Sequence, residues 1–340
     1  MPRLPILALV LSVLVAGACS SRAFKSAPYD LHPQVGVGEI HQGVRLLGTL
    51  RLADAEIDGL ELCGLSGLAW DEDEGLLYAV SDRGVLFHLR PRFDSRGYLS
   101  GASPVAARPL QSASGQPVSR PFRDSEGLAI RNGDNRISGD TELVVSFEAK
   151  PRVVRYRPNG EWRGEVPLPA TLREAGNYRD SNRALEAVAI DPVWGIVTGP
   201  ELALRNDPKS LVRLFSASGR SGFYPLGDAP GSALVAMEAL PQGGLLTLER
   251  AFVSILHPFT IRLRRTELPR QDKRRLKVRD VAVFDSGQGW LVDNFEGLTR
   301  YRERRFFMVS DDNCNGLQAT LLMYFELLPF EAPPATATEH

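Results

Sequence analysis

Carboxylate side chains recur along this chain at one position of a repeated sequence pattern. The clearest copy is the segment 124–130 (DSEGLAI), an apolar run that is entered through two acids and contains a glycine. Similar runs occur at intervals of roughly 50 to 60 residues, and a regular spacing of this size is typical of repeat architectures. The residues at the keyed position of the five copies are Ser66, Glu126, Glu186, Glu238 and Glu296.

A second acid follows each of these runs, at the end of another short apolar segment. The segments have the length and composition of β-strands. Carboxylates that converge on one site repel each other, so they require protonation, a cationic side chain or a metal ion. The acids at this second position are Asp82, Glu148, Glu201, Glu249 and either Asp311 or Asp312.

The ligand types in this pattern indicate which metal ion the acids would bind. Oxygen ligands without histidine or thiolate favour calcium, with magnesium as the alternative, over zinc. The chain has five histidines, and none of them stands at the spacing of a zinc motif. The expected metal ligands are Asp82, Glu126, Glu186, Glu238, Glu249, Glu296, Asp311 and Asp312.

Three basic residues follow repeat acids closely and could neutralise an anionic substrate group such as phosphate. With two of the glutamates they form the expected catalytic set: Glu126, Glu186, Arg83, Lys150 and Arg250. The alternative for any single acid is a structural role in turns or in binding neighbouring backbone amides. Ser66 replaces the repeat glutamate in the first copy, but the chain lacks the Gly-x-Ser-x-Gly motif of serine hydrolases.

The repeated unit predicts the elements that must position these acids. Each unit consists of a strand, a turn, a strand that ends in a carboxylate, and a polar stretch with two further short strands. Four strands in about 40 to 60 residues correspond to one blade of a β-propeller. We therefore predict an all-β fold, a single β-propeller of five to six four-stranded blades over residues 44–330, with its ring closed by N- and C-terminal strands. The segment 281–293 is the candidate for an abbreviated sixth module.

The three cysteines lie near the ends of the predicted domain. Cys63 precedes the first repeat strand, and Cys314 follows the last acidic run. The first and last modules of a closed ring are neighbours, so these two residues are expected to form a disulfide, which would stabilise the fold by about 4 kcal/mol or more. Two separately buried thiols are the alternative.

The N-terminal segment 1–19 has the features of an export signal. A basic residue precedes an apolar stretch, and small residues lead to Cys19. The sequence around Cys19 resembles a bacterial lipoprotein box, so we expect lipidation at this cysteine and attachment to a membrane, with simple secretion as the alternative. The expected location is the periplasm or cell envelope. Residues 20–43 are expected to be a linker, and residues 331–340 a disordered tail.

Composition excludes several classes of function. The 340 residues carry a formal net charge of −1, which gives no electrostatic basis for nucleic-acid binding. No phosphate-binding loop, dinucleotide fingerprint or redox pair of cysteines is present in the sequence. A hydrophobic fraction of 43% is ample for one packed domain, and we expect a monomer.

Several motifs in their order resemble a known family. They are 64–68 (GLSGL), 78–84 (YAVSDRG), 124–129 (DSEGLA), 248–250 (LER), 293–298 (DNFEGL) and 310–313 (SDDN). Together they are similar to the phytase-like family, "esterase-like activity of phytase", whose members are exported bacterial β-propeller proteins. The resemblance covers about residues 44–330. The third module departs from it, because Glu186 is followed by Ala-Val in place of Gly-Leu.

The family resemblance implies hydrolysis of phosphoesters or esters and kinship with calcium-dependent propeller phosphatases and phytases. The favoured hypothesis is an exported calcium-dependent phosphoric ester hydrolase with an acid-lined central funnel, acting on a small molecule. A metal-dependent lactonase or carboxylesterase is the alternative among enzymes. The alternative outside enzymes is an envelope lipoprotein that binds a glycan, a peptide or another protein and uses its acids for a structural calcium ion.

Overall fold

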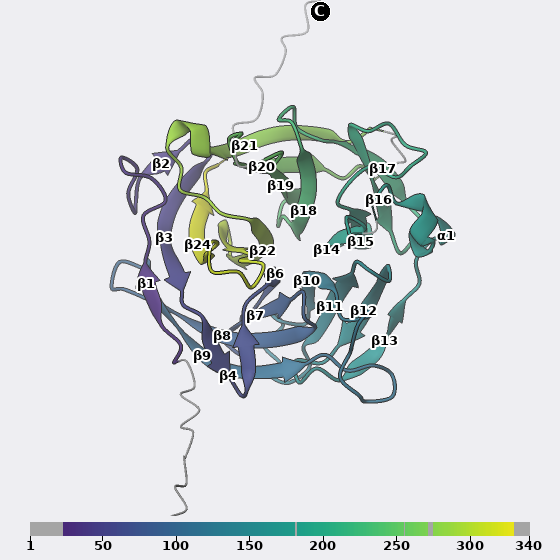
Figure 1. Ribbon diagram of the computed structural model, residues 1–340, viewed down its shortest axis with the longest axis horizontal. Helices are drawn as coiled ribbons and strands as arrows, with labels where there is room; N and C mark the ends of the chain where they lie inside the picture. Colours follow the sequence, from purple (N-terminus) through teal and green to yellow (C-terminus); the bar gives the residue numbers. More distant parts are fainter. Residues whose placement is uncertain (1–22, 181, 255, 271–274, 330–340) are drawn as a thin grey trace, which may run out of the picture.

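The predicted β-propeller is confirmed, and it has five blades. The computed structural model describes residues 23–180, 182–254, 256–270 and 275–329. Figure 1 shows five antiparallel sheets arranged around a central axis, with the chain passing from one blade to the next in sequence order. The innermost strand of each blade borders the axis, so the five inner strands bring residues far apart in sequence to one place.

The first four blades are each built from four consecutive strands. Blade one contains β6 (Leu65–Asp71), β7 (Leu76–Ser81), β8 (Val85–Phe93) and β9 (Leu99–Pro109). Blade two contains β10 (Ser125–Arg131), β11 (Glu142–Phe147), β12 (Arg152–Tyr156) and β13 (Trp162–Val166). Blade three contains β14 (Leu185–Asp191), β15 (Gly195–Pro200), β16 (Leu211–Ser216) and β17 (Ser221–Pro225). Blade four contains β18 (Ser232–Ala239), β19 (Leu245–Ala251), β20 (Thr260–Glu267) and β21 (Lys277–Asp285).

The fifth blade closes the ring with strands from both ends of the chain, as predicted. It contains β22 (Phe295–Arg302), β23 (Arg305–Ser310) and β24 (Thr320–Leu327), and its outer strand is β3 (Val44–Leu52). β3 pairs with β24 from Thr320↔Leu52 to Leu327↔Val44. Part of the expected linker 20–43 is instead ordered in this sheet, because β1 (Ser26–Pro28) and β2 (Ile40–His41) both pair with β3.

The segment proposed as a sixth module belongs to blade four and to the connection that follows it. Residues 277–285 form β21, which pairs along its length with β20. A short 3-10 helix, η2 (Ser286–Gln288), then leads into β22. Val281, Ala282 and Phe284 of β21 are buried. Their apolar side chains explain why the sequence of this segment predicts a strand, although the segment starts no blade.

A covalent link joins the first and last blades. The hairpin of β4 (Ala55–Ile57) and β5 (Leu60–Leu62) leads directly to Cys63. Cys63 and Cys314 form a disulfide, as expected, across a sequence separation of 251 residues. The predicted export segment, Cys19 and the tail 331–340 lie outside the described residues.

Apolar packing between neighbouring blades holds the ring together. Tyr78 and Leu86 of blade one, for example, share a buried cluster with Leu128 and Val145 of blade two. Successive side chains of these strands point to opposite faces of the sheet, and both sets are buried because every blade is covered on both sides. Outside the strands, α1 (Ala170–Arg173) and η1 (Ala175–Asn177) lie between blades two and three. No helix of the described residues is long and apolar enough to cross a membrane.

Candidate functional site

A β-bulge in the inner strand of every blade sets the position of the keyed residue. The pairing of the first and second strands skips one residue or more at the same place in all five blades. In blade four the skip lies between Leu234 and Ala236, so the equivalent residue there is Val235 and the predicted equivalence of Glu238 is wrong. The third blade keeps the bulge although Ala187 replaces glycine. The five bulge residues are Ser66, Glu126, Glu186, Val235 and Glu296.

The second repeat position is equally regular, and it also changes type in blade four. Arg250 pairs with Ala233 one step outside the bulge, which is the position that an acid takes in the other blades. Glu148, for example, donates its amide N–H to the Asp124 carbonyl in blade two. The residues at this position are Asp82, Glu148, Glu201, Arg250 and Asp311.

Glycines follow three of the bulge residues because neighbouring inner strands approach closely there. A Cβ atom on Gly67 would lie 2.5 Å from the carbonyl oxygen of Glu126, and one on Gly127 would lie 2.6 Å from that of Glu186. Side chains at these positions would push the inner strands apart. The glycines therefore allow the acids of different blades to converge.

Three of the bulge residues, Glu126, Glu186 and Glu296, border a cavity of about 520 Å³ at one end of the channel, together with all five second-position residues. We call it the acid cavity. Its acids outnumber its arginines by eight to three. The lining residues are Asp82, Arg120, Pro121, Arg123, Asp124, Glu126, Glu148, Ala149, Asn182, Glu186, Glu201, Arg250, Glu296, Asp311 and Asn313.

Three glutamates form the floor of the acid cavity. Glu126, Glu186 and Glu296 each place one carboxylate oxygen so that the three oxygens lie within 4.8 Å of one another, and all three side chains are buried. Desolvation and mutual repulsion raise the pKa of Glu126 and of Glu186 well above the ordinary value. Burial also raises the pKa of Glu296, although Arg250 acts in the opposite direction.

A second group of carboxylates shares Glu126 with the first. Asp124, Glu126 and Glu148 also bring one oxygen each within 4.8 Å of the others. Burial and the neighbouring acids raise the pKa of Glu148 to about 8 and that of Asp311 to about 9. Such shifts mean that the ionised forms lack sufficient compensation from the protein alone.

Arg250 neutralises one side of the acid cavity. Its Nη2 atom donates to Glu201 Oε1 at 2.6 Å, and its Nη1 atom donates to Glu296 Oε1 at 3.0 Å and to Asn294 Oδ1 at 2.6 Å. The surrounding carboxylates raise the pKa of the guanidinium, so Arg250 remains charged. Because its hydrogen bonds go to protein groups, Arg250 holds the acids in place.

The donor set fits a hard divalent cation. Every side chain of the two carboxylate groups offers oxygen, which is the ligand type that calcium prefers. Asp82 Oδ1 is buried and has no hydrogen-bond partner among the described residues. A Cβ atom on Gly64 would lie 2.2 Å from this oxygen, so the backbone leaves room for the carboxylate there. Desolvation raises the pKa of Asp82 as well.

Other predicted site residues lie outside the acid cavity. Arg83 donates to Glu61 at 2.6 Å on the surface. Lys150 is exposed and is not among the residues that line the cavity. Of the two candidate aspartates, Asp311 lines the cavity, whereas Asp312 accepts hydrogen bonds from the Gly64 amide at 2.8 Å and the Thr320 hydroxyl at 2.8 Å. Asp312 therefore anchors a loop.

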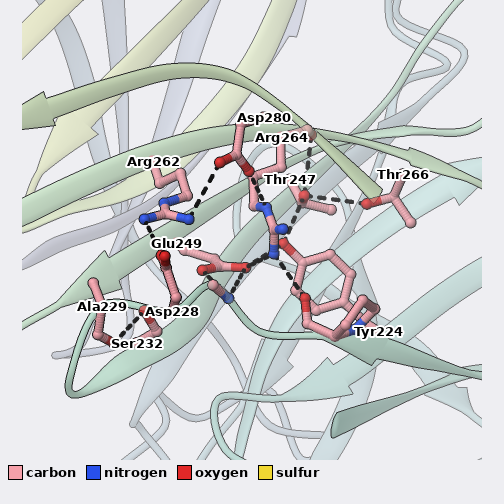
Figure 2. Close-up of polar contacts among 12 residues, drawn as sticks. Tyr224, Asp228, Ala229, Ser232, Thr247, Glu249, Arg262, Arg264, Thr266 and Asp280 are labelled. Carbon is pink, nitrogen blue, oxygen red and sulfur yellow. Dashed lines mark hydrogen bonds and ion pairs between the residues drawn. The ribbon is translucent and has the colours of Figure 1, made fainter. Parts of the chain in front are cut away.

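Glu249 points toward blade three, away from the channel. Figure 2 shows its carboxylate among Tyr224, Arg264 and Asp280. The Tyr224 hydroxyl donates to Glu249 Oε1 at 2.5 Å, and Arg264 donates to the same oxygen at 2.7 Å. Arg264 also donates to Asp280 at 2.7 Å. The expected metal ligand is thus half of a buried ion pair that links three strands of one blade.

Some residues of the acid cavity were not in the predicted site. Glu148 and Glu201 occupy a repeat position that the sequence revealed, and Asp124 lies within the repeated segment itself. Arg120 and Arg123 stand in the loop between β9 and β10. The connections between the other blades differ from this loop in length and sequence, so no repeat pattern could indicate that its arginines border the cavity.

Comparisons with known proteins agree with the motifs. A search of curated proteins finds no match. Among solved structures, the PQQ-bound form of an aldose sugar dehydrogenase from Streptomyces coelicolor is similar, with 10% identity, a TM-score of 0.43 and coverage of 85% of this chain and 99% of that chain. The model of the family described as "Phytase-like: Esterase-like activity of phytase" matches residues 61–314. The match spans most of the propeller, and the chain therefore belongs to the phytase-like family.

Proposed function

We propose that this protein is a calcium-dependent hydrolase of phosphoric esters and that the acid cavity is its active site. The observation that carries the proposal is the convergence of Glu126, Glu186 and Glu296, buried and within 4.8 Å of one another, on the floor of an open cavity. Buried carboxylates with raised pKa values are characteristic of functional sites. Family membership favours ester hydrolysis over simple ion storage.

The two carboxylate groups would hold calcium, with Glu126 common to both. A bound calcium ion would supply Lewis-acid polarisation of the phosphoryl oxygen and activation of a water molecule. Arg250 fixes the orientation of Glu296 and Glu201 through its hydrogen bonds. The sequence placed Arg250 in the catalytic set. In this proposal Arg250 instead positions the acids.

The rim of the acid cavity supports an anionic substrate. Arg120 is exposed and Arg123 is half-buried, and both line the cavity. Among the described residues neither arginine has an ion pair within 4.0 Å, and guanidinium groups bind phosphate oxygens well. They replace Arg83 and Lys150 as the residues expected to hold a phosphate. A neutral lactone or carboxylester would not use them.

We further propose that the protein works outside the cytoplasm as a monomer, in the periplasm or cell envelope, with a lipid on Cys19. The Cys63–Cys314 disulfide supports this location, because disulfides persist in oxidising compartments. Labelling cells with a radioactive fatty acid and comparing the natural chain with Cys19→Ala tests the anchor. Incorporation that survives this substitution contradicts it.

Hydrolysis assays test the proposed activity. We expect calcium-dependent release of nitrophenol from p-nitrophenyl phosphate or bis(p-nitrophenyl) phosphate, and little from p-nitrophenyl butyrate. Glu126→Gln should abolish the activity, whereas Glu249→Gln, a matched change of a buried acid outside the cavity, should retain it. Preference for the butyrate ester favours a carboxylesterase. No turnover of any ester by the folded, calcium-loaded protein would favour a binding protein.

A further inference from the structure

A second cavity lies at the opposite end of the central channel. It has a volume of about 610 Å³, within the range of small-molecule sites. One residue of each inner strand reaches it, four positions beyond the bulge residue. These five residues are Trp70, Ile130, Ile190, Ala239 and Arg300. We call this space the lower cavity.

The lower cavity is separate from the acid cavity. Between them the channel narrows to a space of about 10 Å³, which is bordered by Gly67, Gly127 and Gly297. This volume is too small for an organic molecule to pass. A ligand in the lower cavity therefore reaches the protein from the other face, and its binding is independent of the proposed hydrolytic site.

Glu238 places a carboxylate in the lower cavity at a repeat position that is uncharged in the other blades. The equivalent position, three residues after the bulge, is occupied by alanine in blades one to three and by Thr299 in blade five. The residue next to the glutamate, Ala239, is the smallest in the ring of five. Desolvation raises the pKa of Glu238 to about 7, although the Arg300 charge and two backbone amides act in the opposite direction.

The arginines around the lower cavity have other partners. Arg131 lies 3.3 Å from Glu142, Arg300 lies 3.5 Å from Asp134, and Arg302 lies 2.5 Å from Glu72. Within the described part of the chain, no cation comes within 4.0 Å of the Glu238 carboxylate. Glu238 is thus a half-buried acid without an ion-pair partner.

One part of the wall of the lower cavity is apolar, beside the charged residues already described. Trp70 and Tyr301 contact each other with ring centroids 4.7 Å apart, and Ile130, Ile190 and Leu240 complete this surface. Aromatic faces attract cations, and apolar walls bind the body of an organic ligand. An unpaired carboxylate next to such walls matches a molecule that carries one positive charge on an apolar frame.

We propose that the lower cavity is a second binding site, which takes a small organic cation with an aromatic or apolar body and uses Glu238 as its counter-ion. The ammonium or guanidinium group of the ligand would contact the Glu238 carboxylate. Its apolar part would lie against Trp70 and Tyr301. The structure gives this site no role in ester hydrolysis, so the two functions can be tested separately.

Calorimetric titration of the full-length, calcium-loaded protein with 2-phenylethylammonium chloride tests this proposal. We expect saturable binding with one site per chain and a change in tryptophan fluorescence. The neutral analogue 2-phenylethanol should bind at least about tenfold more weakly, because it lacks the charge that pairs with the carboxylate. Glu238→Gln, which preserves the side-chain shape, should weaken the binding of the ammonium compound by a similar factor.

Two matched variants distinguish the lower cavity from other anionic surfaces. Glu303→Gln removes one charge from the exposed rim of the same cavity, and Glu296→Gln removes one from the acid cavity. Both should bind 2-phenylethylammonium as the natural chain does. The proposal is overturned if the protein shows no saturable binding or binds the alcohol with equal affinity. It is also overturned if Glu296→Gln or Glu303→Gln loses as much binding as Glu238→Gln, or more.

Discussion

The Arg250 guanidinium donates a 2.6 Å hydrogen bond to Glu201 Oε1 at the position where four of the five blades carry an acid. This arginine is therefore an internal cation in a ring of carboxylates. It compensates the charge of one side of the acid cavity and leaves the group around Glu126 dependent on protons or a metal ion.

Replacement of Arg250 should destabilise the calcium-free protein. Arg250→Met removes the charge and keeps much of the side-chain volume, so Glu201 and Glu296 would remain buried without their cation. We expect a loss of about 3 kcal/mol in the free energy of unfolding, measured by urea denaturation in the presence of a chelator. Arg250→Lys should lose less. An unchanged unfolding midpoint in Arg250→Met would contradict the role of this arginine.

Removal of calcium should lower the thermal stability of the natural chain, because a ligand that binds only the folded state stabilises it. Glu126 belongs to both carboxylate groups, so Glu126→Gln should weaken calcium binding by about tenfold or more. Calorimetric titration and melting curves with and without chelator measure both effects. Tight calcium binding by the folded Glu126→Gln variant would show that the ions bind elsewhere.

The Glu249 network should contribute to stability without affecting calcium. Glu249→Gln leaves Arg264 with a weaker partner in a buried place, and we expect a cost of about 2 kcal/mol. Tyr224→Phe, which removes one hydrogen bond to the same carboxylate, should cost about 1 kcal/mol. Urea denaturation measures both. Reduced calcium affinity in folded Glu249→Gln would place this glutamate among the ligands after all.

The Cys63–Cys314 disulfide should stabilise the closed ring strongly. It joins residues separated by 251 positions, and cross-links over long loops restrict the unfolded chain most. The Cys63→Ser/Cys314→Ser variant is expected to lose about 4 kcal/mol or more. Calorimetry of this variant and of the natural chain with and without reductant provides the comparison. A reductant that destabilises both proteins equally would indicate another cause.

Stability should depend on pH through Glu238. Its folded pKa of about 7 lies above the ordinary value near 4.5, so the folded state favours the protonated form. The penalty for ionisation is absent below about pH 4.5, grows between pH 4.5 and 7, and is complete above pH 7. Across this window Glu238→Gln should gain stability relative to the natural chain, by an amount on the order of 2 kcal/mol. A constant difference from pH 4 to 8.5 would rule out this titration.

The sequence was most informative where the repeat is unbroken. Glu126, Glu186 and Glu296 lie in segments that share the same spacing to their strands, and the structure brings them together. The prediction failed in blade four. There the glutamate in 236–240 (AMEAL) resembles the others, yet the bulge falls at Val235. A bulge shifts the pairing register by one residue, and local sequence similarity does not reveal where it lies.

A shift of one residue also separates Glu249 from Arg250. Successive side chains of a strand point to opposite faces, so the register that places Arg250 in the channel turns Glu249 toward Arg264. From sequence alone the acid was the obvious member of the pair. Only the pairing of β18 with β19 decides which of the two lines the cavity.

The sequence by itself determined the repeat and the all-β class, because both follow from periodicity. It predicted ring closure by an N-terminal strand and a Cys63–Cys314 disulfide from the adjacency of first and last blades, and the structure decided both. The tertiary structure decided the blade count, the bulge registers, and which loop residues reach the acid cavity. Arg120 and Arg123 illustrate the limit: they stand in a loop outside the repeat, and their place depends on how neighbouring blades pack. That packing is a property of long-range contacts, which no local pattern records.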